Sequence, residues 1–588
     1  MKIKLFFAAL AAVAFLAASC SEEEIGSNGT DVNGLIKGKT VATFTLNLSN
    51  PTTKALYSFD PDGKQSDANQ ERKINPADVR LLIFDLGSGI LDVNQKFDVT
   101  PVGGIPYSTD VTGYKLTKTV QLMAGDKKIY VIANAGSITT AIAALTEDVS
   151  TLAAFNAIVF NAGTPQFPWT AKTPSERSFH IDGLYAFSGT TYGLPASNTD
   201  QYTYQLKAGI PAEESNTNSS GTGGSATVTG STVRQDYNYF EIDLIYMLAK
   251  GRLGYTEAAL SSTTPSASIS DIKYSIHNLA RYTNFIQHVV GGLPLSYYDG
   301  MDFTTPFFTS VAHTANDDYG THFDAGVTVK QAGTKVTGSP SGYVFDIDPD
   351  PYPPFLYVPE NNNRNAILTW GQASHFAVNA HYKPNNIITA VSYQPTSVPP
   401  LQLSQTSTHP SPAVAYFYLL KDVGSIKTGT CFLTYALMQQ ACWLALNATN
   451  IPGGGWDPGT HSTVADGIIG SAPSATVPSE LPDPALSIAP YGYYHFQLPN
   501  TTTNTGGNWY RVAIGDPNNE GSNPAHYKFG VYRGKSYEVI LTSFGGPGVP
   551  YEWMLISDPG EPVDAVTNVT VIVQIKDWDN VQWEHEIP

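Results

Sequence analysis

Short runs of alternating apolar and polar residues, separated by proline, glycine and asparagine, recur along the whole chain. In the first run, Ala42, Phe44, Leu46 and Leu48 alternate with threonine and asparagine before Ser49-Asn50-Pro51 ends it. A period of two places the apolar side chains on one face of a β-strand. Further strand-like runs lie at 79–85, 114–122, 129–133, 239–255, 355–361, 366–370, 376–382, 528–532, 537–541 and 569–575. The chain is therefore predicted to be mainly β, built as β-sandwiches with Greek-key-like connections.

Helical spacing of apolar residues is confined to a few segments. One is 137–160, and another is 431–446, which contains Cys431 and Cys442. Two residues eleven positions apart on one helix are separated by about 16 Å, which is too far for a disulfide. We interpret both cysteines as small buried apolar residues.

A stretch rich in serine, glycine and threonine divides the chain into two parts. It covers 215–231 and predicts a long flexible loop. A chain of 588 residues is long enough for two or three cores. Because a new series of strands starts at Tyr239, we place the domain boundary near Asp236.

The N-terminus has the pattern of an export signal. Lys2 and Lys4 precede an apolar segment, 5–18, that is too short to span a membrane. It leads into Leu-Ala-Ala-Ser-Cys at 16–20, which resembles a bacterial lipobox and predicts acylation of Cys20 after removal of 1–19. The alternative is a plain secretory peptide with a chance cysteine. The acidic run 21–24 looks like the surface-export signal of Bacteroidota lipoproteins, or else is a solvated linker.

Charge and motif content argue against several functional classes. The net charge is −18, which disfavours binding to nucleic acid or to anionic lipid. The sequence has no HExxH, GxSxG, P-loop or CxxC pattern, so neither a catalytic site, a cofactor nor a metal site is expected. Asp346, Asp348 and Asp350 are interleaved with prolines and fit a turn better than a calcium loop. The 51 acidic residues leave the paired carboxylates of a hydrolase open.

Two segments near the ends of the chain are candidates for strand exchange. Pro51-Thr52-Thr53-Lys54-Ala55 follows the first strand and predicts an exposed site for a trypsin-like protease. At the other end, two alternating runs have no later element to pair with. Their apolar residues are Val569, Val571, Val573 and Ile575, then Val581, Trp583 and Ile587. The alternatives are that the first strand is a permanent edge strand and that the last strands pair within their own domain.

Taken in order, these features resemble the Bacteroidales fimbrilins, the stalk subunits of type V pili, most closely the shaft subunit of short (minor) fimbriae. The matching segments are the lipobox, the first strand with 49–55, then 78–84, 128–134, 357–361, Tyr532-Arg533 with Tyr537, 548–550, 558–559 and 569–578. Lys54 stands where the best-known members have arginine, and 423–485 does not align.

The resemblance implies a domain plan of two tandem transthyretin-like β-sandwiches with a few short helices. The signal peptide would cover 1–19, a tether and removable first strand 20–54, and the two domains 55–235 and 236–560. The donor strands would cover 561–588.

The resemblance also implies a mechanism. A trypsin-like protease would cut between Lys54 and Ala55, and the strand with Ala42, Phe44, Leu46 and Leu48 would leave. The donor residues of another subunit would then fill the open slot. The chain would be a non-enzymatic, adhesive fimbrial subunit without cofactors. It would be lipid-anchored as a precursor and would polymerise at the outer membrane with tip and anchor subunits.

Three other functions stay open at the level of sequence. The chain could be a tip or accessory fimbrial adhesin. It could be a monomeric surface lipoprotein that binds glycans, with Trp443, Trp456 and Trp509 stacking on sugars rather than lying in the core. It could also be a secreted hydrolase, which would need convergent acids in a cleft.

Overall fold

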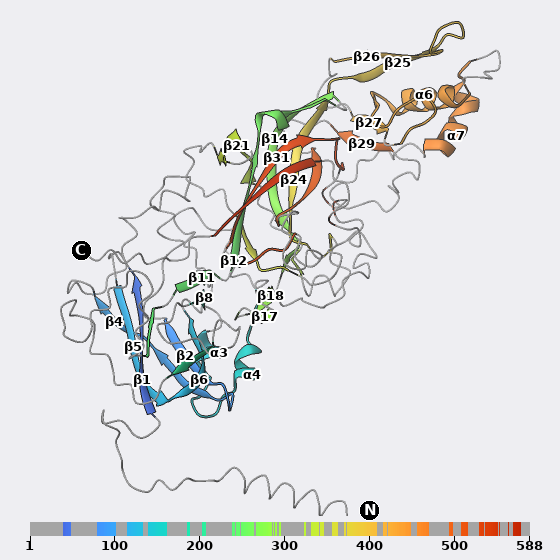
Figure 1. Ribbon diagram of the computed structural model, residues 1–588. Coiled ribbons are helices and arrows are strands. Elements are labelled where there is room, and N and C mark those ends of the chain that lie inside the picture. The colour runs from blue at the N-terminus through green and yellow to red at the C-terminus, as the bar shows by residue number, and fades with distance from the viewer. Residues whose placement is uncertain are drawn as a thin grey trace, which may run out of the picture.

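The computed structural model places strands throughout the chain (Figure 1). It describes 39–48, 79–101, 114–132, 139–161, 185–188, 203–206 and 238–246, and much of 248–577. Within these ranges there are short gaps of one or two residues. Longer gaps cover 296–322, 325–330, 346–355, 363–369, 408–414, 448–454, 470–492, 498–506, 516–528, 556–562 and 564–568.

The N-terminal part contains two four-stranded sheets. One has the order β10-β1-β5-β4, formed by Asn238–Glu241, Lys39–Leu48, Tyr114–Met123 and Asp98–Pro101. The other has the order β3-β2-β6-β9, formed by Leu91–Lys96, Arg80–Asp85, Gly125–Ile132 and Thr203–Leu206. β2 carries the continuous apolar run 81–84 and is one of the two inner strands of its sheet, and all four side chains are buried.

Two strands cross the boundary that the sequence suggested near Asp236. β10 pairs with β1, and β11 (Asp243–Tyr246) pairs with β8 (Tyr185–Ser188). The next strand, β12 (Leu248–Tyr255), belongs instead to a sheet of the C-terminal part. The strands up to β11 therefore pair within the N-terminal part, and those from β12 on belong mainly to the C-terminal part. These pairings could not be read from composition, because the strand partners lie far away in sequence.

Two short helices occupy the segment in which the spacing suggested a longer one. They are α3 (Thr139–Ala143) and α4 (Leu152–Asn156). Between them the backbone turns and bonds to β3, since the Asp148 backbone N–H donates to the Leu91 carbonyl at 2.8 Å. Thr151 caps α4 by accepting from the Ala154 N–H. Hydrogen bonding to the sheet thus replaces continuation of the helix.

The C-terminal part has two larger sheets that share one core. The six-stranded sheet contains β12, β21 (Thr334–Ser339), β22 (Gly342–Phe345), β23 (Leu356–Pro359), β31 (Lys535–Phe544) and β32 (Val569–Asp577). The five-stranded sheet contains β13 (Ser261–Thr263), β14 (Ser266–His277), β20 (Gln331–Ala332), β24 (His375–Pro384) and β30 (Asn508–Ala513). The 3₁₀-helix η5 (Glu257–Leu260) joins β12 to β13.

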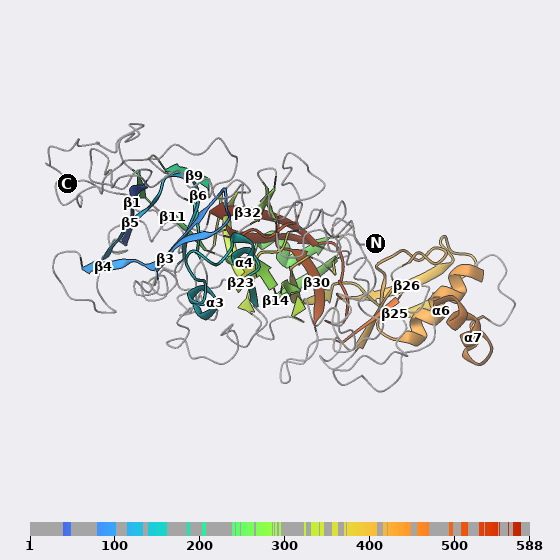
Figure 2. The same cartoon turned by 90° about the horizontal axis from the view of Figure 1, so that it is seen from below.

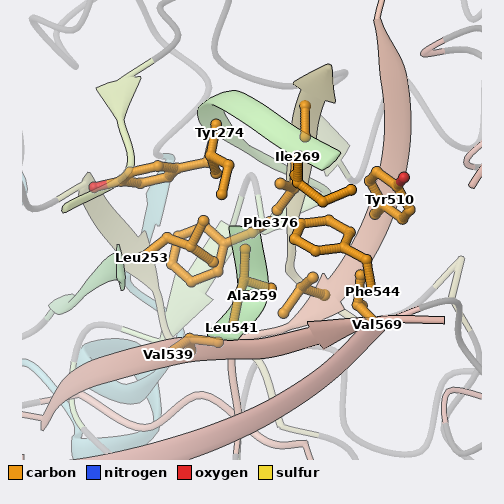
Figure 3. Packing of buried hydrophobic residues seen from close by; sticks show 14 of the residues in the cluster. Leu253, Ala259, Ile269, Tyr274, Phe376, Tyr510, Val539, Leu541, Phe544 and Val569 are labelled. Carbon is orange, nitrogen blue, oxygen red and sulfur yellow. The ribbon is translucent and has the colours of Figure 1, made fainter. Parts of the chain in front are cut away.

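Side chains from both of these sheets meet in a single hydrophobic cluster. Figure 3 shows Leu253, Val539 and Leu541 from one sheet close to Tyr274 and Phe376 from the other. Tyr274 and Phe376 meet edge to face, with ring centroids 5.2 Å apart. The alternating runs of the sequence therefore supply the two faces of one core.

Three pairs of short strands complete the main body. They are β15 (Leu279–Ala280) with β19 (Phe323–Asp324), β16 (Tyr282–Asn284) with β7 (Val159–Asn161), and β17 (His288–Val290) with β18 (Leu293–Leu295).

An inserted unit separates β24 from β30, two strands that pair with each other. Its sheet has the order β26-β25-β28-β27-β29, formed by Leu401–Thr406, Ile387–Tyr393, Cys431–Phe432, Ala415–Leu419 and Tyr493–Gln497. Helices α6 (Tyr435–Asn447) and α7 (Pro458–Ile469) pack against it around a second core. Figures 1 and 2 place this unit at the far end of the molecule from β1.

Cys431 and Cys442 are both free and buried, which confirms that they act as small core residues. The prediction that they lie on one helix is wrong. Cys431 lies on β28, where it pairs with β25 and β27, and α6 begins only at Tyr435. Trp443 and Trp509 are also buried, so these two side chains belong to the core rather than to a sugar platform.

The prediction of a mainly β chain with few helices is confirmed. The tandem transthyretin-like arrangement and its Greek-key connections remain predictions. No helix in the described part of the chain is long and apolar enough to cross a membrane.

Candidate functional site

The first strand, β1, lies inside its sheet rather than at the edge. It pairs antiparallel with β5 over ten residues, from Lys39 opposite Met123 to Leu48 opposite Tyr114. On its other side it pairs parallel with β10 over four residues, from Ala42 opposite Asn238 to Thr45 opposite Glu241. Within the described residues, β1 therefore fills a slot between two strands that are both remote in sequence.

The first half of β1 is buried on one face and partly buried on the other. Ala42 and Phe44 are fully buried, as predicted for the apolar face. Thr40 on the same face is also fully buried, and Val41 on the opposite face is only 9% exposed. The alternation in the sequence did not predict the burial of Val41 on the second face, because a single strand does not show what packs above it.

Strand β5 provides the wall of the slot. Val120 lies opposite Ala42 and Leu122 lies opposite Thr40, and both apolar side chains are buried. On the other face, the hydroxyls of Thr43 and Thr119 are 3.2 Å apart. The slot thus has an apolar inner lining and a threonine pair on its outside.

Strand β10 was not identified as part of the site by sequence reasoning. It lies about 190 residues after β1, and a parallel partner at that distance has no local sequence signal. The local signal is the strand-like run that starts at Tyr239, which predicts a strand but not its partner.

Several predicted site residues lie outside the described residues. These are Cys20, Lys54, Ala55, Val581, Trp583 and Ile587. Leu46 and Leu48 lie on the described backbone of β1, but their side chains are not described. Lipidation, proteolytic processing and the last donor segment therefore remain predictions.

The first of the two C-terminal runs forms β32, the outermost strand of the six-stranded sheet. It pairs antiparallel with β31, from Lys535 opposite Asp577 to Phe544 opposite Val569. Val569 is buried in the main core beside Phe544 (Figure 3), and Val571, Val573 and Ile575 pack against that core. This is the intrachain pairing that the sequence left open for these residues.

Two buried ion pairs anchor the sheet that carries β32. Arg252 on β12 donates to Glu538 on β31, and the Arg252 guanidinium lies 3.6 Å from the Phe345 ring centroid. Arg533 donates to Glu360 through Nε and Nη2 at 3.0 and 2.7 Å. All four charged side chains are buried. In both pairs each buried charge has a partner of opposite sign, so neither pair leaves an uncompensated charge in the core.

The described residues contain no group of three or more His, Cys, Asp or Glu side chains that could hold a metal ion.

His277 and His375 have ring centroids 5.8 Å apart, and His277 contacts Glu552 at 3.1 Å. Burial, and to a smaller extent the charge of His277, lower the pKa of His375 to about 3. His375 is therefore a neutral core residue at physiological pH.

Comparisons with known proteins give fold-level neighbours among solved structures. No protein-family profile matches the chain, and no curated protein matches it. A fimbrilin from Porphyromonas gingivalis is 11% identical, with 92% of this chain and 99% of that chain covered at a TM-score of 0.36. The tip fimbrial protein of the same organism is 10% identical, with 92% and 100% covered at a TM-score of 0.30.

A third neighbour is a candidate cell adhesion protein from Parabacteroides distasonis. It is 12% identical, with 92% of this chain and 100% of that chain covered at a TM-score of 0.35. The structural neighbours of this chain thus include fimbrilins and adhesion proteins of Bacteroidales. Because the TM-scores of all three neighbours are below 0.5, these likenesses do not carry the functional argument below.

Proposed function

We propose that this chain is a shaft subunit of a cell-surface fimbria and that it polymerises by exchanging β1 for a strand of another subunit. The supporting observation is the position of β1. It fills an apolar slot, yet its sheet partners, β5 and β10, lie far from it in sequence. No tight hairpin joins it to either of these two described strands. A single cut between Lys54 and Ala55 would therefore separate β1 from the rest of the chain.

Loss of β1 would leave a state that favours strand addition. The inner strand edges of β5 and β10 would lose their partner, and the pockets of Ala42 and Phe44 would open to water. Exposed edges with an apolar lining readily accept an extended segment. Each fully buried side chain of Phe or Val size contributes about 1.5–3 kcal/mol on insertion.

The donor would come from the C-terminal segment of a neighbouring subunit. β32 is an edge strand with one partner among the described strands, and the segment 578–588 continues beyond it. In this proposal Val581, Trp583 and Ile587 enter the slot first. The residues of β32 then have two possible roles. They either leave β31 and follow into the slot, or stay paired with β31 and connect the donor strand to its own subunit; they are Val569, Val571, Val573 and Ile575.

The precursor would reach its site of assembly as a lipoprotein acylated at Cys20. A trypsin-like protease would cleave it at the outer membrane, and tip and anchor subunits would end the fibre. The fimbria would act in adhesion and biofilm formation, without enzymatic activity.

The test is the substitution Lys54→Ala, with Lys64→Ala as a matched control in the same polar stretch. We expect Lys54→Ala to keep Cys20 at its N-terminus and to form no fibres. Lys64→Ala should show Ala55 as its first residue and form normal fibres. Mass spectrometry of the N-terminus and electron microscopy of the cell surface provide both readouts. Normal fibres whose subunits retain 39–48 would refute the proposal.

The second candidate is a monomeric glycan-binding lipoprotein, which would keep β1 throughout its life. The burial of Trp443 and Trp509 removes two of the three side chains that could form its aromatic platform. In the same experiment this candidate predicts acylated Cys20 in every variant, including the unmodified chain.

A further inference from the structure

One short strand pair joins the two parts of the molecule independently of the covalent connection between β11 and β12. β7 belongs to the N-terminal part and β16 to the C-terminal part. They pair antiparallel, with Val159, Phe160 and Asn161 opposite Asn284, Thr283 and Tyr282. Among the strand pairs of the described residues, it is the one that connects a strand before residue 247 to a strand after it.

The N-terminal end of this connection is fixed in its own core. β7 follows α4 directly, and Phe155 of α4 is fully buried. The Phe155 ring stacks on Phe84 of β2 at a centroid distance of 5.3 Å and meets Tyr130 of β6 at 5.0 Å. β7 is therefore held close to the sheet β3-β2-β6-β9.

The C-terminal end is fixed by a buried charge. Arg533 Nη2 donates to the Asn284 carbonyl of β16 at 2.8 Å, and the same guanidinium donates twice to Glu360. Both side chains are buried, with exposures of 1% and 0%. Glu360 directly follows β23, which pairs with β12, and the adjacent Asn361 pairs with Val531. Arg533 thus links β16 to the sheet that begins the C-terminal part.

We propose that β7, β16 and the Arg533–Glu360 pair form an interdomain strap that holds the two parts in one relative orientation. A single covalent crossing leaves relative motion of two domains as the default. A second attachment, rooted in both cores, removes that freedom. This inference does not depend on the proposed function, since it concerns the subunit whether or not it polymerises.

The strap is tested on the full chain with a double substitution that removes both charges together. Arg533→Met with Glu360→Gln deletes the bond to Asn284 without leaving one buried charge unpaired. The matched control is Arg252→Met with Glu538→Gln. It removes a second buried Arg–Glu pair that lies wholly within the C-terminal part, between β12 and β31.

Pulsed electron paramagnetic resonance measures the relative orientation. Spin labels carried by non-natural amino acids replace the exposed residues Val149 and Lys383, one in each part. The unmodified chain and the control pair should each give one narrow distance distribution. The strap variant should give a distribution at least twice as broad, together with loss of hydrogen-exchange protection at 282–284.

Two results would overturn the strap. One is a narrow distance distribution in a variant whose 282–284 amides have lost protection. The strand pair would then be open while the relative orientation of the two parts stays fixed. The other is full protection of 282–284 in the variant, because Arg533 would then not hold β16. If the double variant does not fold, Thr283→Pro perturbs β16 by a different route. The distance distribution should again broaden, and protection is then read at Tyr282 and Asn284; a narrow distribution with these two amides unprotected would overturn the strap.

Discussion

A substitution at Phe44 distinguishes two possibilities: that β1 is removed when the subunit assembles, and that β1 stays in the subunit. Its side chain is fully buried in the slot of β1. Replacing a buried phenylalanine by alanine costs about 3–5 kcal/mol through lost transfer energy and the cavity that remains. We therefore expect Phe44→Ala to destabilise the N-terminal part of the precursor by about this amount.

The matched control lies one residue away on the other face of the strand. Thr43 contacts Thr119 through their hydroxyls at 3.2 Å, and a cross-strand pair of this kind contributes roughly 0.2–1 kcal/mol. Thr43→Ala should therefore cost much less than Phe44→Ala. Comparable costs for the two substitutions would mean that Phe44 does not fill a core position.

Hydrogen exchange of the β5 amides in the precursor provides the assay, since β5 pairs with β1 over its full length. A loss of about 3–5 kcal/mol lowers protection by roughly two to three and a half powers of ten. The mature fibre is then measured in the same way. Because β1 would be absent from it, fibres grown from Phe44→Ala and unmodified precursors should have equal β5 protection.

The decisive result is the comparison of precursor and fibre. If Phe44→Ala lowers β5 protection equally in both, β1 remains in the polymer and strand exchange is wrong. If it lowers protection in neither, the slot is not held together by Phe44 and the energetic argument fails.

Other parts of the chain support three more predictions. Deleting 578–588 should give processed subunits that stay monomeric in size-exclusion chromatography. The control substitution His585→Gln should leave polymerisation normal. Polymers of the deletion variant would contradict a donor role for this tail. Burial lowers the pKa of His375 to about 3. Below pH 6.5 the unfolded chain therefore takes up a proton at this residue that the folded chain does not. The free energy of unfolding should thus fall on acidification. Between pH 7 and pH 5 this loss of unfolding free energy is about 2 kcal/mol, and urea unfolding should show that His375→Asn lacks it. An identical pH dependence of stability in the unmodified chain and the variant would contradict this prediction. Burial raises the pKa of the Cys431 thiol and raises that of the Cys442 thiol to about 12. Neither thiol should therefore react with iodoacetamide in the folded protein at pH 8, whereas both should react in urea. Rapid labelling of either thiol in the folded state would contradict their burial.

The strand pattern could be predicted from sequence because it depends on neighbouring residues. Alternation at 41–48 and 569–575, the continuous apolar run at 81–84 and the largely apolar segment 376–382 identified β1, β32, β2 and β24. The same local logic failed where tertiary pairing competed with helical spacing. Cys431 has helical spacing relative to Cys442, yet it joins a strand because β25 and β27 offer hydrogen-bond partners on both sides.

The pairing of strands was decided by the tertiary structure alone. Nothing at 238–241 marks it as the parallel neighbour of β1, and nothing at 159–161 marks it as the partner of β16. The sequence by itself determined most of the long strands and their apolar faces, since a side chain's direction follows from its position along a strand. Which strand lies beside which depends on backbone hydrogen bonds that carry no side-chain identity, so the slot around β1 and the strap between the two parts emerge only once the chain is folded.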